Sequence, residues 1–302
     1  MGVIRVLQQF QVQVRFHPPP EALRRYFTTF YHVEWSVPGG ERLEDHLMPE
    51  WANLRIHDGD WPEAWSLDGQ HVAGTHFPVT GPSSQAVRFA CGSTRMWGIG
   101  LLPLGWAKLV GVPAAAYGDC VRDGMSDPAF AQFRPLAEGL YGPAPDHQAE
   151  YVRIAAFFMD RLGEPVADEA RITAIHAALV DPEIGSVGQL VARAGVSQRT
   201  VERICARAFG FSPKLLLRRQ RFMRSLSQFM LDPSLKWIGA IDDNYHDQAQ
   251  FVRDCRQFMG MTPTQYAALS KPLIGAVMRE RERMAGSAVQ TLDGPEGPMR
   301  RR

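Results

Sequence analysis

Two short segments of the sequence carry arginine, glutamine and glutamate at the spacing of a helix face. They read "SQRTVERI" and "HDQAQFVRD", and each interleaves polar with apolar residues. Arginine can donate two hydrogen bonds to guanine, glutamine can pair with adenine, and glutamate can accept from cytosine. The side chains that suit this chemistry are Gln198, Arg199, Glu202 and Arg203 in the first segment and Gln248, Gln250 and Arg253 in the second.

These polar side chains need a helix whose other face holds it on the protein. Val201 and Ile204 in the first segment and Phe251 in the second are expected to point inward. Arg199 and Arg203 are favoured as base readers. The glutamines can read adenine or touch only phosphate, which carries no sequence information.

A nearly repeated phrase indicates where these helices end. Residues 203–213 read "RICARAFGFSP" and residues 253–263 read "RDCRQFMGMTP". A glycine after a helical run can take the left-handed conformation that ends a helix. A hydroxyl residue followed by proline then begins the next helix. The residues in these roles are Gly210, Ser212 and Pro213 in the first phrase and Gly260, Thr262 and Pro263 in the second.

The residues before each phrase complete a helix-turn-helix pattern. In "SVGQLVARAGVSQRTVERI" a helix is followed by a turn at Gly195 and a second helix capped by Ser197. In "SLKWIGAIDDNYHDQAQFVRD" Asn244 stands at the turn, because asparagine tolerates a left-handed backbone. One helix of about 18 residues should hold the units rigidly apart, about 27 Å long at 1.5 Å per residue. Its arginines are expected to contact phosphate or solvent.

The charge of the chain is unevenly distributed. The whole chain has a formal net charge of +1, but residues 181–302 carry 19 Lys and Arg against 12 Asp and Glu. This part is therefore +7 and the remainder −6. A basic region suits an anionic partner, although part of the excess lies in the terminal "MRRR" and a solvated basic surface is an equal alternative.

Residues 1–125 alternate short strand-like stretches with turn signals such as "VPGG", "HDGD" and "VTGPSS". We expect a mostly β domain here. Six of the seven tryptophans lie in this part. They either fill a β core or wall an apolar ligand pocket, for which the candidates are Trp35, Trp51 and Trp97.

The rest of the chain reads as helical. We expect a helical connector over 126–166, a DNA-binding domain over 167–278, and disorder over 279–302, which is charged and rich in Gly and Pro. In the connector, "EYVRIAAFFMDRL" places Ile154 and Phe158 on an apolar stripe. That stripe should pack on another subunit or on the neighbouring domain.

The sequence predicts a cytoplasmic protein without a membrane segment or cofactor. Met1 to Phe16 alternates polar and apolar residues like a strand and lacks a signal-peptide pattern. The most apolar run, 97–118, is interrupted by Lys108, prolines and glycines. The four cysteines form no closely spaced metal pair, which favours reduced thiols.

Two segments together resemble the DNA-binding domain of the AraC/XylS family of bacterial transcription regulators. They read "GVSQRTVERICARAFGFSPK" and "YHDQAQFVRDCRQFMGMTPTQY", within a match over about 186–267. The sequence departs from the family at Cys205 and Cys255, where an aromatic residue is usual, and at Asn244, where glycine is usual. The N-terminal "RFHPPPEALRRYF", "TGPSSQAVRF" and "GIGLLPLGWAKLVGVPA" are similar to the cupin-like sensor domain of some regulators.

The resemblance implies an α+β fold with a β-rich cupin-like N-terminal domain followed by an all-α domain of two helix-turn-helix units. It also implies double-stranded DNA, a small-molecule effector and a second copy in a homodimer as partners, with RNA polymerase added for an activator. An architectural DNA-binding protein without an effector is the alternative. A metal-dependent cupin enzyme is disfavoured, because the histidines include no closely spaced His-x-His followed by a carboxylate. These histidines are His46, His57, His71 and His76.

Overall fold

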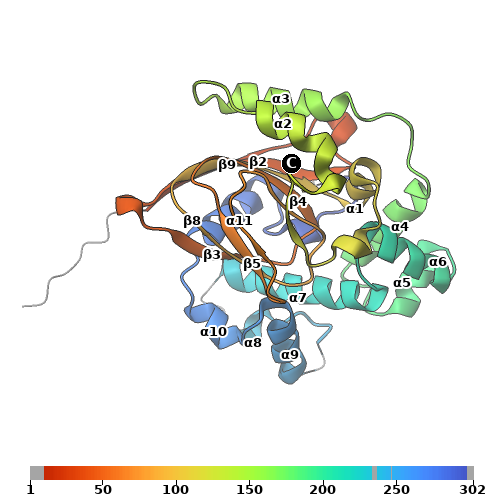
Figure 1. Ribbon diagram of the computed structural model, residues 1–302. Coiled ribbons are helices and arrows are strands. Elements are labelled where there is room, and N and C mark those ends of the chain that lie inside the picture. The colour runs from red at the N-terminus through yellow and green to blue at the C-terminus, as the bar shows by residue number, and fades with distance from the viewer. Residues whose placement is uncertain (1–9, 233–236, 246, 298–302) are drawn as a thin grey trace, which may run out of the picture.

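The computed structural model describes residues 10–232, 237–245 and 247–297. Figure 1 shows two β-sheets face to face, with α2 and α3 above them and α7 below. The fold is α+β, as expected, with the strands in the N-terminal part and most helices after them. No helix in the described ranges combines the length and apolar character needed to cross a membrane.

The described strands form two antiparallel sheets. The first has six strands in the order β1-β2-β9-β4-β7-β10, and the second has four in the order β3-β8-β5-β6. The predicted strand over Met1–Phe16 corresponds to β1, which begins at Gln11, and residues 1–9 lie outside the described part. The strands are β1 (Gln11–His17), β2 (Phe27–Ser36), β3 (Leu43–Leu47), β4 (Ala52–Gly59), β5 (Glu63–Ser66), β6 (His71–Val72), β7 (Pro78–Thr80), β8 (Val87–Cys91), β9 (Thr94–Leu101) and β10 (Val121–Asp123).

Alternation along β2 and β4 gives the six-stranded sheet two different faces. Successive side chains of a strand point to opposite faces. On one face Phe30 contacts the ring of Phe158 from α3, at 6.2 Å between centroids. On the other face Tyr31 lies over Gly98 of β9, its register partner. A Cβ atom at Gly98 would fall 1.9 Å from the Tyr31 ring, so this close approach requires glycine.

The connector packs on the outer face of the six-stranded sheet. It comprises η5 (Pro128–Phe133), α2 (Arg134–Gly139) and α3 (His147–Met159). The apolar stripe of α3 is covered by its own chain: Ile154 and Phe158 are fully buried, and Phe158 lies 4.6 Å from Phe27 between ring centroids. Of the two expected partners for this stripe, the structure therefore selects the neighbouring domain.

Short helical turns link the strands. They are η1 (Glu21–Leu23), η2 (Pro38–Gly40), α1 (Pro103–Gly105), which continues as the π-helix η3 (Trp106–Val110), and η4 (Ala114–Tyr117).

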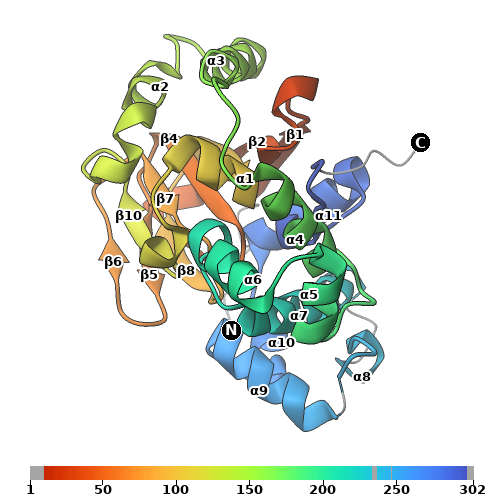
Figure 2. The same ribbon diagram turned by 90° about the vertical axis from the view of Figure 1, so that its right-hand side faces the viewer.

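The C-terminal helices follow the predicted order of two units and a linking helix. In Figure 2 the first unit lies beside α7, and α9, which belongs to the second unit, lies below α7. The helices are α4 (Glu169–Val180), α5 (Val187–Ala194), α6 (Gln198–Ile204) with its π-helical continuation η6 (Cys205–Phe209), α7 (Pro213–Leu231), α8 (Trp237–Ala240), α9 (Gln248–Met259), α10 (Pro263–Ala268) and α11 (Pro272–Ala285).

The predicted helix ends and starts are confirmed. Gly210 and Gly260 have φ of 86° and 72° and end η6 and α9 in the left-handed conformation. The hydroxyls of Ser212 and Thr262 accept from backbone N–H groups of the next helix, and proline occupies the first turn of each. Gly195 and Ser197 likewise close α5 and cap α6. The repeated phrase is thus one helix junction used twice.

The second turn is built differently from the prediction. Asn244 was expected in the left-handed region, but the described non-glycine residues with positive φ are Asp119 and Asp168. Asn244 acts through its side chain, whose amide donates to the carbonyl oxygen of Pro182 and to Asp242. A side-chain bond therefore closes this turn where the backbone conformation was expected to do so.

The arginines of α7 bind the second unit. Arg218 and Arg221 pair with the buried carboxylate of Asp254 on α9, and Arg224 pairs with Asp242. They were expected to contact phosphate or solvent. Their positions on α7 face the acidic groups of the following unit, so they hold that unit on the linking helix instead.

The linking helix α7 also fastens the C-terminal part to the sheets. Arg219 is fully buried, and its guanidinium donates to the backbone oxygen of Ser83 and lies 4.1 Å from the ring centroid of Trp51. At the end of α9, Phe258 accepts a backbone hydrogen bond of 2.7 Å from Ala86. Both helix-turn-helix units are therefore docked on the N-terminal domain.

The expected disorder after residue 278 is wrong for residues 279–297. Helix α11 continues to Ala285 and is followed by η7 (Gln290–Leu292), and Val289 and Asp293 are buried. The charged residues of this segment suggested an exposed, disordered chain, but one of them, Arg281, is buried in an ion pair with Asp293. Residues 298–302 lie outside the described part.

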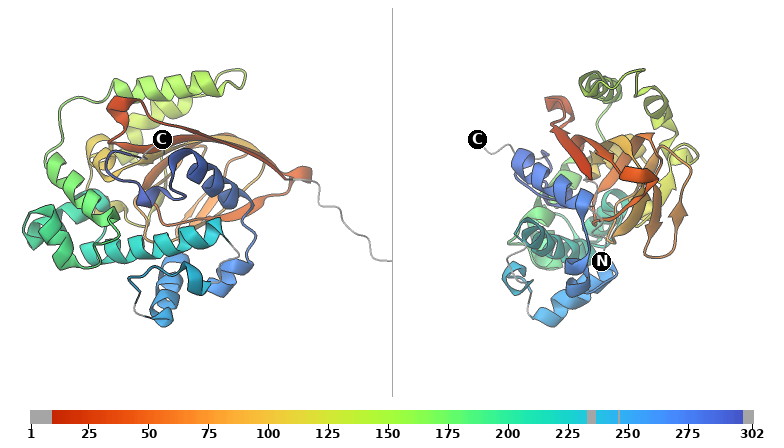
Figure 3. Two further views of the ribbon diagram at one scale, coloured as in Figure 1. Left: turned by 180° about the vertical axis from the view of Figure 1, so that it is seen from behind. Right: turned by 90° about the vertical axis from the view of Figure 1, so that its left-hand side faces the viewer.

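Helix α11 returns to the N-terminal domain. It packs against β1 and β3, the edge strands of the two sheets, and so lies across the gap between them (Figure 3). Asp45 of β3 is buried, and its carboxylate accepts from the backbone N–H groups of Leu273 and Ile274 at 3.0 and 2.9 Å. A side chain of the sheet therefore caps the helix that follows the DNA-binding part.

Candidate functional site

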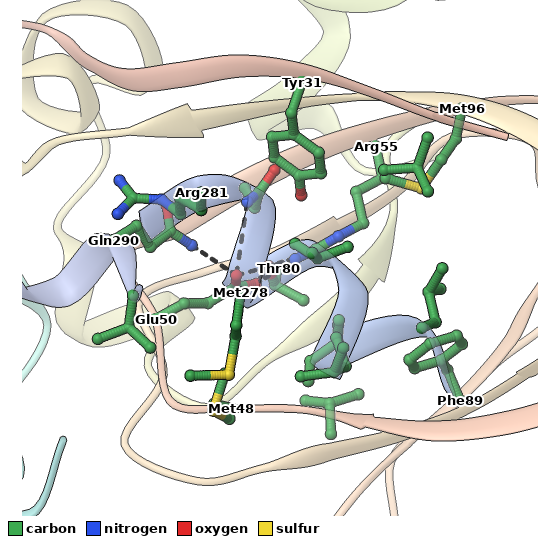
Figure 4. Close-up of a pocket in the computed structure, with 18 of the residues that line it drawn as sticks. Tyr31, Met48, Glu50, Arg55, Thr80, Phe89, Met96, Met278, Arg281 and Gln290 are labelled. Atoms are coloured by element: carbon green, nitrogen blue, oxygen red, sulfur yellow. Dashed lines mark hydrogen bonds and ion pairs between the residues drawn. The ribbon is translucent and has the colours of Figure 1, made fainter. Parts of the chain in front are cut away.

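A cavity of about 130 Å³ lies between the two sheets and under α11. Its walls are the inward faces of β2, β4, β7 and β8, the loop before β4, and the C-terminal segment from α11 to η7 (Figure 4). Most lining side chains are apolar. They include Val33, Met48, Val87, Phe89, Met96, Leu273, Ile274, Val277 and Met278.

One end of the cavity carries a saturated polar cluster around Glu50. The Glu50 carboxylate accepts two hydrogen bonds from Arg55, at 2.7 and 2.8 Å, and one from Thr80 at 2.8 Å. Gln290 of η7 adds a bond of 2.5 Å to the same carboxylate. Figure 4 shows these side chains converging on Glu50. Because Arg55 and Glu50 neutralise each other, the cluster brings no net charge to the cavity.

Two residues that line the cavity each contain a buried polar atom without a hydrogen-bond partner in the described part of the chain. Trp35 and His57 are 2% and 5% exposed, and both line the cavity. The indole N–H of Trp35 and Nδ1 of His57 have no partner among the described residues. Their rings lie edge to face, 6.3 Å apart between centroids. Burial and the nearby Arg55 lower the pKa of His57 to about 3, so its imidazole is neutral at pH 7.

Of the three tryptophans proposed for the pocket, Trp35 lines this cavity and the other two do not. Trp51 points to the domain interface, where it contacts His176 and Phe209. Trp97 points to α3 and donates its indole N–H to Glu150 at 2.7 Å. Both are fully buried because they pack between the sheet and the helices. The number of tryptophans in the sequence does not distinguish such core residues from residues that line a pocket.

The contribution of α11 was not predicted from the sequence. Leu273, Ile274, Val277 and Met278 face the cavity, and they occupy positions i, i+1, i+4 and i+5 of one helix face. The stretch "PLIGAVM" carries this signal. Its neighbour Arg281 donates hydrogen bonds to Asp293 and to the backbone oxygen of Ser287. The Glu50–Arg55 pair was also missed, because the two residues read as ordinary surface charges.

On the first unit, the proposed base readers lie on the exposed face of α6, while Val201 and Ile204 are buried as predicted. Arg203 donates to Asp168 at 2.9 Å, so its guanidinium is held at the start of α4. Arg199 is exposed and has no ion-pair partner within the described ranges. The other two proposed readers, Gln198 and Glu202, are exposed and hydrogen-bonded to each other at 2.9 Å.

On the second unit, α9 presents Gln248 and Arg253 to solvent, and Phe251 is buried as predicted. The Arg253 side chain is 64% exposed, and its guanidinium is 4.0 Å from Asp247. Gln250 is half-buried and faces a groove between the two units that is also lined by Lys214 of α7. The two sets of proposed readers therefore belong to separate helices: α6 precedes α7 in the chain, and α9 packs on α7 through Arg218, Arg221 and Phe222.

The histidines and cysteines do not assemble a metal site in the described part of the chain. No group of three or more His, Cys, Asp or Glu side chains gathers there as ligands would. His71 stacks on Trp65 at 5.1 Å between ring centroids, and His76 lies near Trp61. The four cysteines are buried and free.

Comparison with known proteins places the C-terminal part in a family. Residues 190–268 match the model of the helix-turn-helix domain, from the middle of α5 to the end of α10. The C-terminal part of this chain is an AraC-type helix-turn-helix domain. The AraC-type domain thus includes both units and α7, and α11 follows it directly. No curated protein matches the chain.

Several solved structures are similar to the chain at low sequence identity. ToxT from Vibrio cholerae, in a structure at 1.65 Å resolution, is 10% identical, with 86% of this chain and 98% of that chain covered and a TM-score of 0.42. A structure of ToxT with unsaturated fatty acid bound is 11% identical, covering 86% and 95%, with a TM-score of 0.38. The AraC-like transcriptional activator CuxR is 11% identical, covering 71% and 86%, with a TM-score of 0.24.

Proposed function

We propose that this protein is a ligand-responsive transcription regulator, in which an effector bound between the sheets acts on the AraC-type domain through α11. The observation that carries the proposal is the position of α11. This helix follows α10 of the AraC-type domain within four residues, and its side chains form one wall of the cavity. A molecule that enters the cavity must therefore contact or displace the helix attached to the second unit.

The same helix has fixed attachments that can transmit such a displacement. Asp45 caps its first turn, and Gln290 of the following segment binds Glu50 in the cavity wall. Coupling between two sites requires a shared element whose arrangement both sites bias. Helix α11 meets that requirement, because one end adjoins the DNA-binding part and its face adjoins the cavity.

DNA reading is assigned to α6 and α9. Arg199 and Arg203 on α6 and Arg253 on α9 are the proposed base readers, and the neighbouring exposed polar residues are supporting contacts. Arg199 supports this assignment best, since its guanidinium is exposed and free to reach a base edge. Arg203 has to leave Asp168 before it can do the same.

The remaining features of the proposal follow from the family. We assign the protein to the cytoplasm, as a homodimer formed through its N-terminal part, with RNA polymerase as a further partner if it activates transcription. A role as an enzyme is not proposed. The architectural alternative is disfavoured by the cavity, because an architectural protein does not need a cavity lined by apolar side chains inside its N-terminal domain.

A comparison of two variants of α11 tests the coupling. The operator is first selected from random duplex DNA with the full chain. Ile274→Ala enlarges the cavity and loosens α11, and it should change operator affinity about fivefold or more. Met284→Ala alters the same helix at a residue that is 38% exposed and outside the cavity, and it should leave the affinity unchanged. Equal affinities for both variants and the natural chain would count against coupling through α11.

A further inference from the structure

The charged groups of the cavity wall are all neutralised before any ligand arrives. Arg55 is paired with Glu50, and Arg281 is paired with Asp293. His57 is neutral at pH 7 because burial lowers its pKa to about 3. A buried ligand with a net charge would therefore find no free counter-charge among these lining groups, and an unpaired buried charge is strongly unfavourable.

Trp35 and His57, which both line the cavity, have unused hydrogen-bonding capacity. An indole nitrogen can only donate a hydrogen bond, and Nδ1 of a neutral imidazole donates or accepts according to its tautomer. Both atoms are buried without a partner in the described structure. Buried polar groups are nearly always hydrogen-bonded, so a ligand oxygen that reached the indole N–H of Trp35 from the cavity would satisfy it.

The size and lining of the cavity limit the rest of the molecule. A volume of about 130 Å³ is close to the roughly 150 Å³ of an engineered apolar cavity that binds benzene. The methionines Met48, Met96 and Met278 can adjust to ligands somewhat larger than this, because their side chains are flexible.

We propose that the effector of this cavity is a small, uncharged and largely apolar molecule that carries one hydroxyl or carbonyl oxygen, held by the indole N–H of Trp35 beside His57. Simple phenols and cyclic ketones belong to this class, and carboxylates do not. That this ligand acts as an effector rests on the proposed function, whereas the chemistry of its binding rests on the cavity alone.

Three probes of similar size separate the contributions. Phenol supplies a neutral hydroxyl, toluene has a methyl group in its place, and benzoate carries a negative charge. Calorimetric titration of the full chain at pH 7 should show saturable binding of phenol and toluene. Benzoate should bind at least tenfold more weakly than phenol. Tighter binding of benzoate than of phenol, or no binding of phenol at millimolar concentration, would overturn the proposal.

A variant at Trp35 tests the hydrogen bond itself. Trp35→Phe removes the indole N–H but keeps an aromatic ring, so phenol should bind about tenfold more weakly while toluene changes less than twofold. The toluene measurement accounts for altered packing. Trp61→Phe is the matched control, since Trp61 is 49% exposed and lies outside the cavity lining. An equal loss for phenol and toluene in Trp35→Phe would overturn the assigned role of the indole N–H.

The outcome is independent of the proposed function. If phenol binds through Trp35 but operator affinity does not respond to it, the ligand chemistry holds and coupling to DNA fails. If Ile274→Ala shifts operator affinity but phenol does not bind, coupling holds and the proposed ligand class is wrong.

Discussion

The two helix-turn-helix units share one phrase, but they differ in the side chain that is buried at one equivalent position. Aligned on Gly210 and Gly260, the position of Ile204 in the first unit corresponds to Asp254 in the second. Ile204 is buried in the apolar core that joins α6 to the N-terminal domain. Asp254 is equally buried, but it is bonded to Arg218 and Arg221 of α7 and to the hydroxyl of Tyr245.

This difference shows that two units can share the same helix junction and still bury side chains of different chemistry. Apolar packing fixes the first unit against the sheets, where Phe209 contacts Trp51. The second unit also packs on the linking helix through apolar side chains, where Phe222 contacts Phe251 and Phe258, but a buried ion-pair cluster lies beside this packing. Because of these buried charges, we expect the second unit to respond more strongly to changes at single polar residues.

The largest effect is expected from breaking the cluster in the second unit. Asp254→Ala leaves Arg218 and Arg221 without their carboxylate and should lower the free energy of unfolding by about 3 kcal/mol. This is the low end for buried pairs, because the Arg218 side chain is 32% exposed and keeps part of its hydration. Denaturant unfolding measures the change.

Two further variants sharpen that result. Asp243→Ala, at an exposed residue of the same turn, should stay within about 0.5 kcal/mol of the natural chain. Ile204→Val at the equivalent site of the first unit should cost only about 1 kcal/mol. A loss at Asp254 no larger than that at Ile204 would remove the distinction between the two units.

The next effect concerns DNA reading by the first unit. Arg199→Ala should weaken operator binding by about 1–3 kcal/mol and relax the preference at one base pair. Fluorescence anisotropy at fixed salt, on operator and on random duplex, measures both. Arg207→Ala removes an equal charge from an exposed position of η6 and should weaken both duplexes alike. If Arg199→Ala also weakens both alike, Arg199 contacts phosphate only.

Acid should destabilise the packing of α4 between the N-terminal domain and η6. His176 of α4 is buried between Trp51 and Phe209, and burial lowers its pKa to about 3. Below pH 6.5 the unfolded chain binds a proton at this residue and the folded chain does not, so stability is lost as pH falls from 6.5 towards 3. The slope from this residue approaches about 1.4 kcal/mol per pH unit. Unfolding of His176→Phe between pH 7 and pH 5 should lack this contribution, and identical slopes would contradict it.

The smallest effect is expected at the ion pair that restrains Arg203. Asp168→Ala frees the Arg203 guanidinium, whose side chain is 49% exposed, and should strengthen operator binding by less than about 1 kcal/mol. The gain should vanish in the double variant with Arg203→Ala. A gain that survives in the double variant would show that Asp168 acts by repelling the DNA backbone.

The sequence predicted local features better than contacts between distant segments. Helix ends at Gly210 and Gly260 are determined by neighbouring residues, so they could be located from the pattern alone. The docking of α11 depends on residues more than 200 positions away, such as Asp45. No local sequence pattern predicts such a contact. The charged stretch after residue 278 was therefore predicted to be disordered.

The candidate sites divide in the same way. The exposed positions of Arg199 and Arg253 follow from helix periodicity and were predicted. The cavity was only partly predicted, because Trp35, Trp51 and Trp97 look alike in sequence. Trp35 and Trp97 lie on paired strands but point to different faces of the sheet, and Trp51 precedes β4. The strand pairing and the bulge in β2 between Phe27 and Phe30 cannot be read from composition.

The central claim is that α11 connects the cavity to the AraC-type domain, and amide hydrogen exchange of the full chain with and without operator DNA tests it most directly. DNA contacts α6 and α9 in this account, and residues 272–292 belong to neither of these helices. Coupling predicts that operator binding also changes exchange in α11 and in η7, and that Ile274→Ala reduces this change. Exchange that changes only between α5 and α9, with residues 272–292 unaffected, would contradict the claim.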